Sequence, residues 1–176
     1  MIEFSKTLGP GDYKAGIVNS VNEIPMGSML KIEWEHDKGV FVLDRVEPAI
    51  FAKPVNYGFI PSTLDEDGDE LDTLVVCAEP IPTGVVVEGR IVGIMNFNDG
   101  GDADHKVVVV PTDERDTDNR VKNLEDLGEG WKRKIEHHFN HYKDLYKPGS
   151  TKVLGWGDAE EAKKVVAESI ERYASK

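Results

Sequence analysis

The feature that most constrains the fold is a series of short apolar runs separated by turn residues. Over the first two-thirds of the 176-residue chain these runs have strand length, and no helical period separates them. In "MLKIEWE" (29–35), Leu30, Ile32 and Trp34 alternate with charged residues, as in a strand with one buried face. A hairpin-type turn, "HDKG", comes next, and the further β-rich runs are "GVFVLDRV", "LDTLVVCA", "GVVVEGRIVGIMNF" and "HKVVVVP". This spacing predicts a β-barrel or a β-sandwich.

The last third of the chain changes to a helical period. Apolar and aromatic residues recur at three and four in "WKRKIEHHFNHYKDL" (131–145), which predicts an amphipathic helix that Pro148-Gly149 ends. "KVLGW" is a short extended piece. A second helix, "AEEAKKVVAESIERYA", is predicted to begin after Asp158 as N-cap, with Glu161 placed as in a capping box. The pattern therefore predicts a compact barrel carrying two helices.

Length and composition indicate one globular domain, which we expect to cover residues 1–176. Hydrophobic residues make up 39% of the chain, enough for a core, and the formal net charge is −12. This charge argues against a surface for nucleic acid or for a membrane. Cys77 is the only cysteine, so an internal disulfide is excluded. Because we find neither a signal-peptide pattern nor a membrane-length apolar run, we expect a soluble cytoplasmic protein.

The stretch "DEDGDELD" (65–72) contains six acidic residues among eight. It could be a solvated turn, a calcium-binding loop or the wall of a site for several divalent cations. An EF-hand loop that starts at Asp65 requires glycine at its sixth position and glutamate at its twelfth. Those positions hold Glu70 and Val76, so we reject the EF-hand. A solvated turn stays open, because acidic residues and glycine are favoured in turns.

A metal site explains the spacing of the acidic residues better. Asp67 and Asp69 lie just before an apolar run that begins near Asp72, and a strand there would hold the carboxylates rigidly. A second cluster, "NDGGDADHK", leads into "VVVVP" and carries Asp99, Asp102 and Asp104. Two such turns at one end of a barrel could converge. Hard oxygen donors without a cysteine or histidine pattern suit Mg²⁺ or Mn²⁺.

Chemistry on phosphate also needs cations that hold an anionic substrate. Lys31 and Arg45 occupy predicted strands, and Tyr57, Tyr142 and Lys143 add hydroxyl and ammonium donors. Each also has a structural interpretation, because such residues are common on outer strand faces, in packing positions and on helix surfaces.

Taken together, the motifs resemble the soluble family I inorganic pyrophosphatases. The family signature D-x-D-[PE]-x-D is present as "DGDELD". The surrounding pieces match in order from about Val21 to the final helix: "EIP", "KIE", "LDR", "NYGFIP", "DGDELDTLVV", "ND…DADHK", "HYKDL" and "GW". With this resemblance we expect a mainly β chain with two helices (α+β). Its core would be a closed OB-like five-stranded β-barrel with flanking α-helices.

The resemblance implies an inorganic diphosphatase that hydrolyses pyrophosphate to two phosphates by a multi-metal mechanism. The nucleophile would be a water bridged between metals, and Asp69 would orient and deprotonate it. The metal ligands would be Asp67, Asp72, Asp99 and Asp104, with Asp72 bridging two ions. Mg²⁺ would be the cofactor, with Mn²⁺ or Zn²⁺ as substitutes and Ca²⁺ as an inhibitor.

The resemblance also implies a substrate-binding set: Lys31, Arg45, Tyr57, Tyr142 and Lys143. Glu23 and Glu33 match acidic positions that line the same cavity. The chain departs from the pattern in two places. Many bacterial members have a tyrosine shortly before the Pro-x-Asn-Tyr block, where this chain reads "FAKPVNYG" with Lys53 before proline. The segment "YKPGSTK" is one residue shorter than in relatives, which leaves a phosphate contact open between Lys147 and Lys152.

The resemblance further implies a homo-oligomer, commonly a hexamer. Two other functions stay open on the sequence. One is a non-catalytic metal- or nucleotide-binding barrel that kept the acidic loops. The other is an oligonucleotide-binding barrel, which predicts a basic groove with exposed aromatic residues rather than an acidic mouth.

Overall fold

A computed structural model describes residues 4–36, 38–113 and 120–176. The α-helices are α1 (Phe4–Thr7), α2 (Gly128–His141) and α3 (Ala159–Ala174). Short 3₁₀ helices are η1 (Tyr13–Ala15), η2 (Ala49–Phe51) and η3 (Leu124–Leu127). The strands are β1 (Ile17–Ile24), β2 (Leu30–Glu35), β3 (Val40–Val46), β4 (Asn56–Phe59), β5 (Asp72–Val75), β6 (Val86–Asp99), β7 (Asp102–Ala103), β8 (Lys106–Pro111) and β9 (Thr151–Gly157). The chain is therefore mainly β, of the α+β class.

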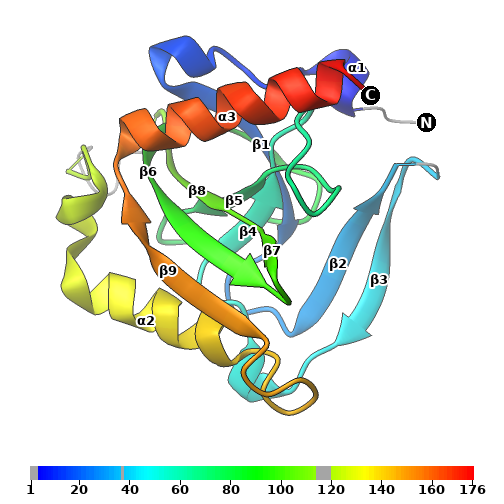
Figure 1. Cartoon of the computed structure of the whole chain (residues 1–176), viewed down its shortest axis with the longest axis vertical. Coiled ribbons are helices and arrows are strands. Elements are labelled where there is room, and N and C mark those ends of the chain that lie inside the picture. The colour runs from blue at the N-terminus through cyan, green and yellow to red at the C-terminus, as the bar shows by residue number, and fades with distance from the viewer. Residues whose placement is uncertain (1–3, 37, 114–119) are drawn as a thin grey trace.

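Five strands pair in a closed cycle. Their order is β1-β4-β5-β8-β6, and β6 pairs back with β1. The long strand β6 also carries β7 and β9, while β2 and β3 form a separate two-stranded ribbon. Figure 1 shows this ribbon on the right, apart from the strand cycle, with α3 above the cycle and α2 at its lower left. The ribbon and the cycle thus provide two walls between which a site can form.

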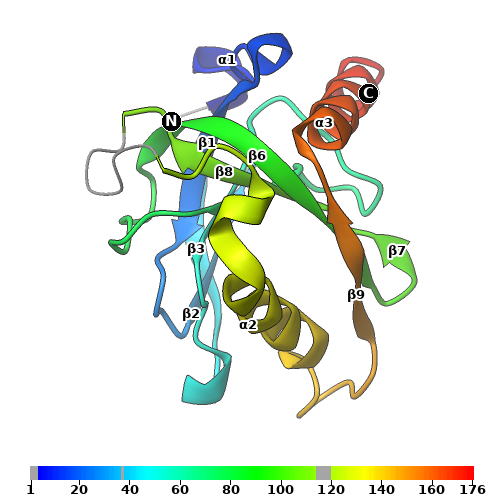
Figure 2. The ribbon, with the colours of Figure 1, turned by 90° about the vertical axis from the view of Figure 1, so that its left-hand side faces the viewer.

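The two long helices cover the sheet with apolar faces. Ala162 and Val166 of α3 are fully buried in a cluster with residues of β5, β6 and β8. Ile135 and Phe139 of α2 are buried in a second cluster, which includes Phe97 of β6. Figure 1 shows α3 lying across the top of the molecule, and Figure 2 shows α2 beside β9. The helical period of the sequence is explained by this one-sided burial.

The predicted helices are present with shifted ends. The helix α2 runs from Gly128 to His141. The predicted range 131–145 therefore begins three residues too late and ends four residues too late. The predicted N-cap of α3 is confirmed, because the Asp158 carboxylate accepts from the Glu161 N–H at 2.9 Å. The Glu161 carboxylate accepts from the Asn96 side chain at 2.7 Å, which ties α3 to β6.

The prediction of two helices was too low, because the N-terminal α1 is a third. Phe4 of α1 packs edge-on against Trp34 of the ribbon at 4.7 Å between ring centroids. The hairpin prediction is confirmed by the antiparallel pairing of β2 with β3, although Asp37 of "HDKG" lies outside the described residues.

Strands β1 and β4 were not predicted from the sequence. In β1 the polar residues Ser20 and Asn22 are fully buried, which hides the expected alternation. The Ser20 hydroxyl forms a hydrogen bond of 2.6 Å with the Thr73 hydroxyl of β5. Within the described ranges no helix is long and apolar enough to span a lipid bilayer.

Candidate functional site

One cavity of about 880 Å³ collects the residues that the sequence analysis singled out. Its lining comes from β1, the β2–β3 ribbon, β4, β5, the acidic turn before β5, the end of β6 and the segment after α2. The predicted site residues found in its wall are Glu23, Lys31, Glu33, Arg45, Tyr57, Asp67, Asp69, Asp72, Asp99, Asp104, Tyr142 and Lys143. The structure therefore brings the whole predicted set into one place.

The acidic turn is anchored by its first residue. The Asp65 carboxylate is buried and accepts from the His105 N–H and from the Arg172 guanidinium, each at 3.1 Å. The Asp65 N–H donates to the Asp69 carbonyl at 2.7 Å, and the Asp69 N–H donates to the Asp67 carboxylate at 3.1 Å. Gly68 has φ +99°, a conformation that favours glycine. The turn is thus a closed unit that presents Asp67 and Asp69 to the cavity.

Strand register explains the surroundings of Asp72. Strands β5 and β8 are parallel, with Asp72 beside Lys106. The Lys106 ammonium, almost fully buried, lies 2.5 Å from an Asp72 oxygen and also pairs with Asp104. Tyr57 lies two residues from the β4 partner of Asp72, so it shares that face, and its hydroxyl donates to Asp72. Topology, rather than sequence proximity, assembles this cluster.

Electrostatics in the cavity disfavour so many bare carboxylates. Burial, helped by the nearby Asp72 charge, raises the pKa of Glu23 to about 8. Burial also raises the pKa of Asp67 to about 6 and raises the pKa values of Asp72 and Asp104. For Lys106, burial alone would lower the pKa, but Asp72 and Asp104 outweigh it and raise the value. The cavity therefore holds more negative charge than its own cations balance.

The ribbon supplies cations from paired positions. Lys31 of β2 and Arg45 of β3 are partners in the register. Lys31 pairs with Glu33, and Arg45 lies 2.5 Å from both Asp44 and Glu47. Because their carboxylate partners are partly exposed, these cations can exchange them for an anionic ligand.

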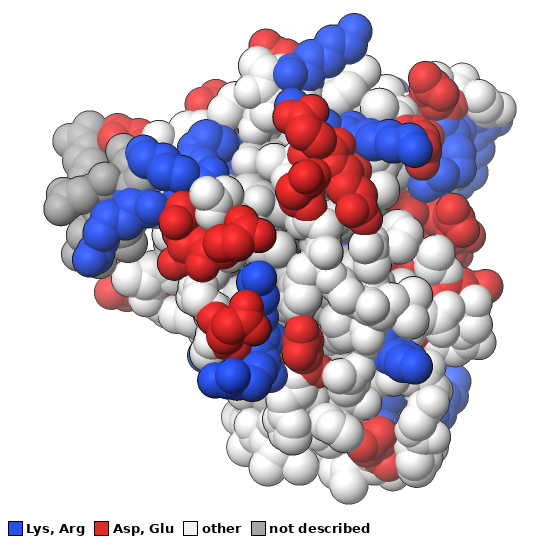
Figure 3. Space-filling view, turned by 60° about the vertical axis from the view of Figure 1, so that its left-hand side comes forward, with Lys and Arg blue, Asp and Glu red and all other residues white. Residues whose placement is uncertain are grey.

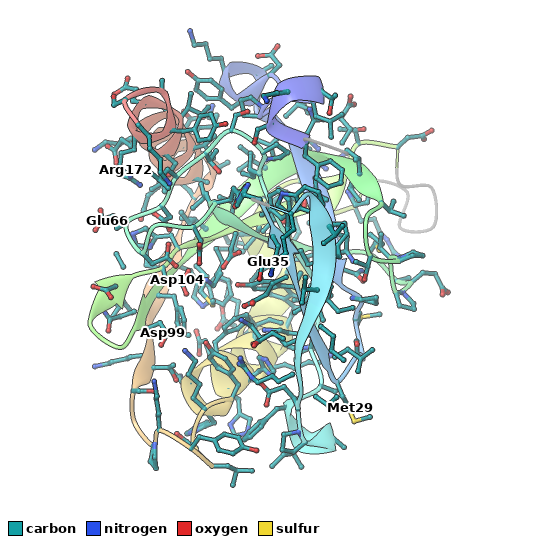
Figure 4. The ribbon with its side chains drawn as sticks, turned by 90° about the vertical axis from the view of Figure 1, so that its right-hand side faces the viewer. Met29, Glu35, Glu66, Asp99, Asp104 and Arg172 are labelled. Atoms are coloured by element: carbon teal, nitrogen blue, oxygen red, sulfur yellow. The ribbon has the colours of Figure 1, made fainter. Side chains whose placement is uncertain are left out.

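The segment after α2 forms a third part of the wall. The Tyr142 hydroxyl donates to Asp99 at 3.0 Å, and the Lys143 ammonium pairs with the same carboxylate. Although burial opposes it, Lys143 lowers the pKa of Asp99. Figure 4 shows Asp99 and Asp104 near one another beside β7. Because Lys106 pairs with both Asp104 and Asp72, and both carboxylates line the one cavity, the second acidic cluster converges with the first.

Three features of the cavity were not predicted. Lys106, which ends the matched piece "DADHK" but was assigned no role, holds the centre of the acidic cluster. Glu70 of the acidic turn pairs with His36 at the end of the ribbon at 2.6 Å. Lys53 lines the cavity, as does Lys147, whereas Lys152 lies on β9 outside the lining.

The donor set fits hard divalent cations in its chemistry. Four carboxylates with raised pKa values face one cavity, and oxygen donors of this kind suit Mg²⁺. Within the described residues, no three Asp, Glu, His or Cys side chains gather closely enough around one point to hold a metal ion. Asp72 and Asp104 turn instead to Lys106. Metal binding would thus require these side chains to reorient.

One face of the molecule carries mixed charge. On the face in Figure 3, lysine and arginine side chains are interspersed with aspartate and glutamate. Together with the net charge of −12, such a face offers no continuous basic groove to a phosphate backbone. That the protein has no nucleic-acid partner stays a prediction.

Comparison with known proteins gives one consistent family. A family model described as inorganic pyrophosphatase matches residues 20–174. The chain is 60% identical over 173 residues to an inorganic pyrophosphatase of Neisseria meningitidis serogroup B, covering 98% of each chain. It is 58% identical to one of Haemophilus influenzae, with the same coverage. A crystal structure of an inorganic pyrophosphatase from Neisseria gonorrhoeae matches with a TM-score of 0.96 and 59% identity, covering 97% of this chain and 99% of that one.

Proposed function

Because this chain belongs to the inorganic pyrophosphatase family and is an enzyme of that class, we propose that it hydrolyses pyrophosphate to two phosphates with divalent metal ions, Mg²⁺ first among them. One observation carries the proposal. A single cavity combines a surplus of buried carboxylates with cations on the facing ribbon. The carboxylates suit metal ions and the cations suit phosphate oxygens.

Asp67, Asp72 and Asp104 would hold activating metal ions, and Asp99 would join Asp104 for a further one. When bound, such ions lower the pKa of a shared water and disperse negative charge on phosphate. Mn²⁺ or Zn²⁺ would substitute, whereas Ca²⁺ would inhibit because it is larger and accepts looser geometry.

Asp69 is proposed as the general base. The Asp69 N–H donates to the Asp67 carboxylate at 3.1 Å, and its carbonyl accepts from the Asp65 N–H. The Asp69 side chain itself is exposed to the cavity. A carboxylate on a fixed backbone can orient an attacking water and accept its proton.

The cations and phenols are proposed to hold the substrate. Lys31, Arg45 and Lys143 now pair with carboxylates that pyrophosphate oxygens would replace. Tyr57 and Tyr142 would donate hydroxyls, since burial raises the pKa of each and keeps the phenol protonated. Glu23 and Glu33 would complete the wall. These contacts strengthen as charge builds on the leaving phosphate.

Several broader properties are part of the proposal. The closed cycle of five strands supports an OB-like barrel, within a single domain over residues 1–176. A homo-oligomer, expected as a hexamer, is supported by exposed apolar side chains on the ribbon and η2, namely Leu30, Leu43, Val46 and Ile50. A cytoplasmic location stays a prediction.

Phosphate release from pyrophosphate tests the function. We expect turnover with Mg²⁺, none in excess chelator, and restoration when Mg²⁺ is added back. Ca²⁺ should compete without supporting turnover. Undiminished phosphate release in chelator would refute the metal requirement.

A further inference from the structure

Lys53 is held rigidly at the wall of the cavity. Its N–H donates to the Ser28 carbonyl at 3.0 Å, and its carbonyl accepts from the Gly27 N–H at 2.8 Å. Pro54 follows, and a residue before proline is biased toward extended backbone. Both backbone groups are therefore satisfied by the turn after β1, and the side chain projects into the cavity that it lines.

Three aromatic rings surround the Lys53 ammonium. Its nitrogen lies 4.3 Å from the ring centroid of Tyr57 and 5.3 Å from those of Phe139 and Tyr142. Such contacts favour a cation through the negative faces of the rings. They orient the ammonium but leave its positive charge without a counterion.

The other enclosed cations of the cavity differ in having carboxylate partners. Those paired cations are Lys31, Arg45, Lys106 and Lys143. Across the described residues, the Lys53 ammonium has no carboxylate within 4.0 Å, the limit for an ion pair. Burial, with the neighbouring charges of Lys31 and Lys106, lowers the pKa of Lys53 to about 7. An enclosed ammonium of this kind gains most from an incoming anion.

On the basis of the proposed function, we propose that Lys53 is a further substrate-binding residue whose ammonium donates to a phosphate oxygen of pyrophosphate from within the aromatic box. The phenols of the box already donate to carboxylates, Tyr57 to Asp72 and Tyr142 to Asp99. The Lys53 ammonium is thus the donor of the box that can bind an anion without first leaving a carboxylate partner. Lys31, across the same cavity, would contact the same bound anion.

The test compares Lys53→Met with the wild type, using Lys53→Gln as a second neutral variant and Lys53→Arg as the conservative one. Lys164→Met, an exposed lysine of α3, is the matched control. Calorimetry measures the Kd of methylenediphosphonate, which cannot be hydrolysed, in the presence of Mg²⁺. Steady-state kinetics give KM and kcat separately, and melting temperature reports folding.

We expect the neutral variants to bind the diphosphonate about tenfold or more weakly, since one charge-assisted hydrogen bond is lost. KM should rise by a similar factor and kcat should change less. Affinity for Mg²⁺ alone should be unchanged, Lys53→Arg should restore most of the binding, and Lys164→Met should match the wild type.

Unchanged diphosphonate binding in both neutral variants would overturn the proposal. So would equal weakening in Lys53→Arg and Lys53→Met together with a lower melting temperature, because the residue would then only support the rings. A wild type that binds diphosphonate but does not hydrolyse pyrophosphate would defeat the proposed function instead. The binding comparison among the Lys53 variants would still decide the role of Lys53.

Discussion

At the scale of single residues, two aspartates of one acidic stretch, Asp69 in the turn and Asp72 at the start of β5, are expected to behave differently. Asp72 is enclosed between Tyr57 and Lys106, whereas Asp69 is exposed to the cavity. We therefore predict that Asp72→Asn weakens Mg²⁺ binding and activity together. Asp69→Asn should lower kcat by roughly 10²–10⁴-fold, since it cannot accept a proton. Its Mg²⁺ affinity should fall much less.

Metal titration by calorimetry, beside rates at saturating Mg²⁺, separates the two roles. Glu66 is an exposed acidic residue of the same turn, and Glu66→Gln serves as the control. If Asp69→Asn kept near-normal turnover, or if high Mg²⁺ repaired it fully, Asp69 would be a ligand and the base would lie elsewhere.

A histidine of α2 should set part of the pH dependence of stability. His138 is buried and stacks on Tyr142, and burial followed by the nearby Lys53 charge lowers its pKa to about 3. The folded state therefore favours neutral His138. This contribution is present above the unfolded pKa of about 6.5 and is lost as pH falls toward about 3.

His138→Phe keeps a ring of similar shape but cannot be protonated. We predict that, between pH 7 and pH 4, its free energy of unfolding falls by on the order of 2 kcal/mol less than that of the wild type. Urea unfolding of the metal-free protein at several pH values measures it. His137→Gln, on the exposed side of α2, should leave the slope unchanged. An identical slope in His138→Phe would show that His138 does not titrate on unfolding in this range.

At the scale of elements, one arginine of the last helix holds the acidic turn by hydrogen bonds. Arg172 of α3 donates to the Leu64 carbonyl at 2.9 Å and to the buried Asp65 carboxylate at 3.1 Å. We predict that Arg172→Met costs about 2–4 kcal/mol of unfolding free energy, because it leaves a buried charge unpaired. Adding Asp65→Asn should recover part of the loss. Chemical denaturation measures the free energy of unfolding of the single and double variants, with Arg133→Met at an exposed position as the control. Strictly additive losses would argue against an interaction between Arg172 and Asp65.

The elements also show what the sequence could and could not predict. Helices with one apolar face follow from their period, and so does the strand "LKIEWE". The fully buried face that its alternation predicted is wrong, because Ile32 and Trp34 are only partly buried and Leu30 is exposed. Strand β1 does not, because its buried Ser20 bonds to Thr73 only once β5 is beside it. The site residues were predictable by motif. The role of Lys106, the last residue of "DADHK", was not, since it depends on the parallel register that places Lys106 next to Asp72.

At the scale of the whole molecule, excess negative charge is concentrated where the fold closes on the cavity. The chain carries a net charge of −12, and several carboxylates in the cavity have raised pKa values. Burial of these carboxylates, together with the smaller repulsion among them, opposes the compact state, so ions that bind only the folded protein should stabilise it. At a Mg²⁺ concentration about 100 times its Kd, mass action contributes about 2.7 kcal/mol.

For a domain of this length, that free energy corresponds to a rise in melting temperature of about 5–10 °C. We predict this rise when Mg²⁺ is added to chelator-treated protein, and a much smaller one in Asp72→Asn. Scanning calorimetry in NaCl of matched ionic strength separates site binding from general screening of the net charge. An equal rise in melting temperature in NaCl alone would mean that the cavity carboxylates affect stability only through the net charge of the protein. A rise specific to Mg²⁺ and dependent on Asp72 would tie the stability of the fold to occupancy of the cavity.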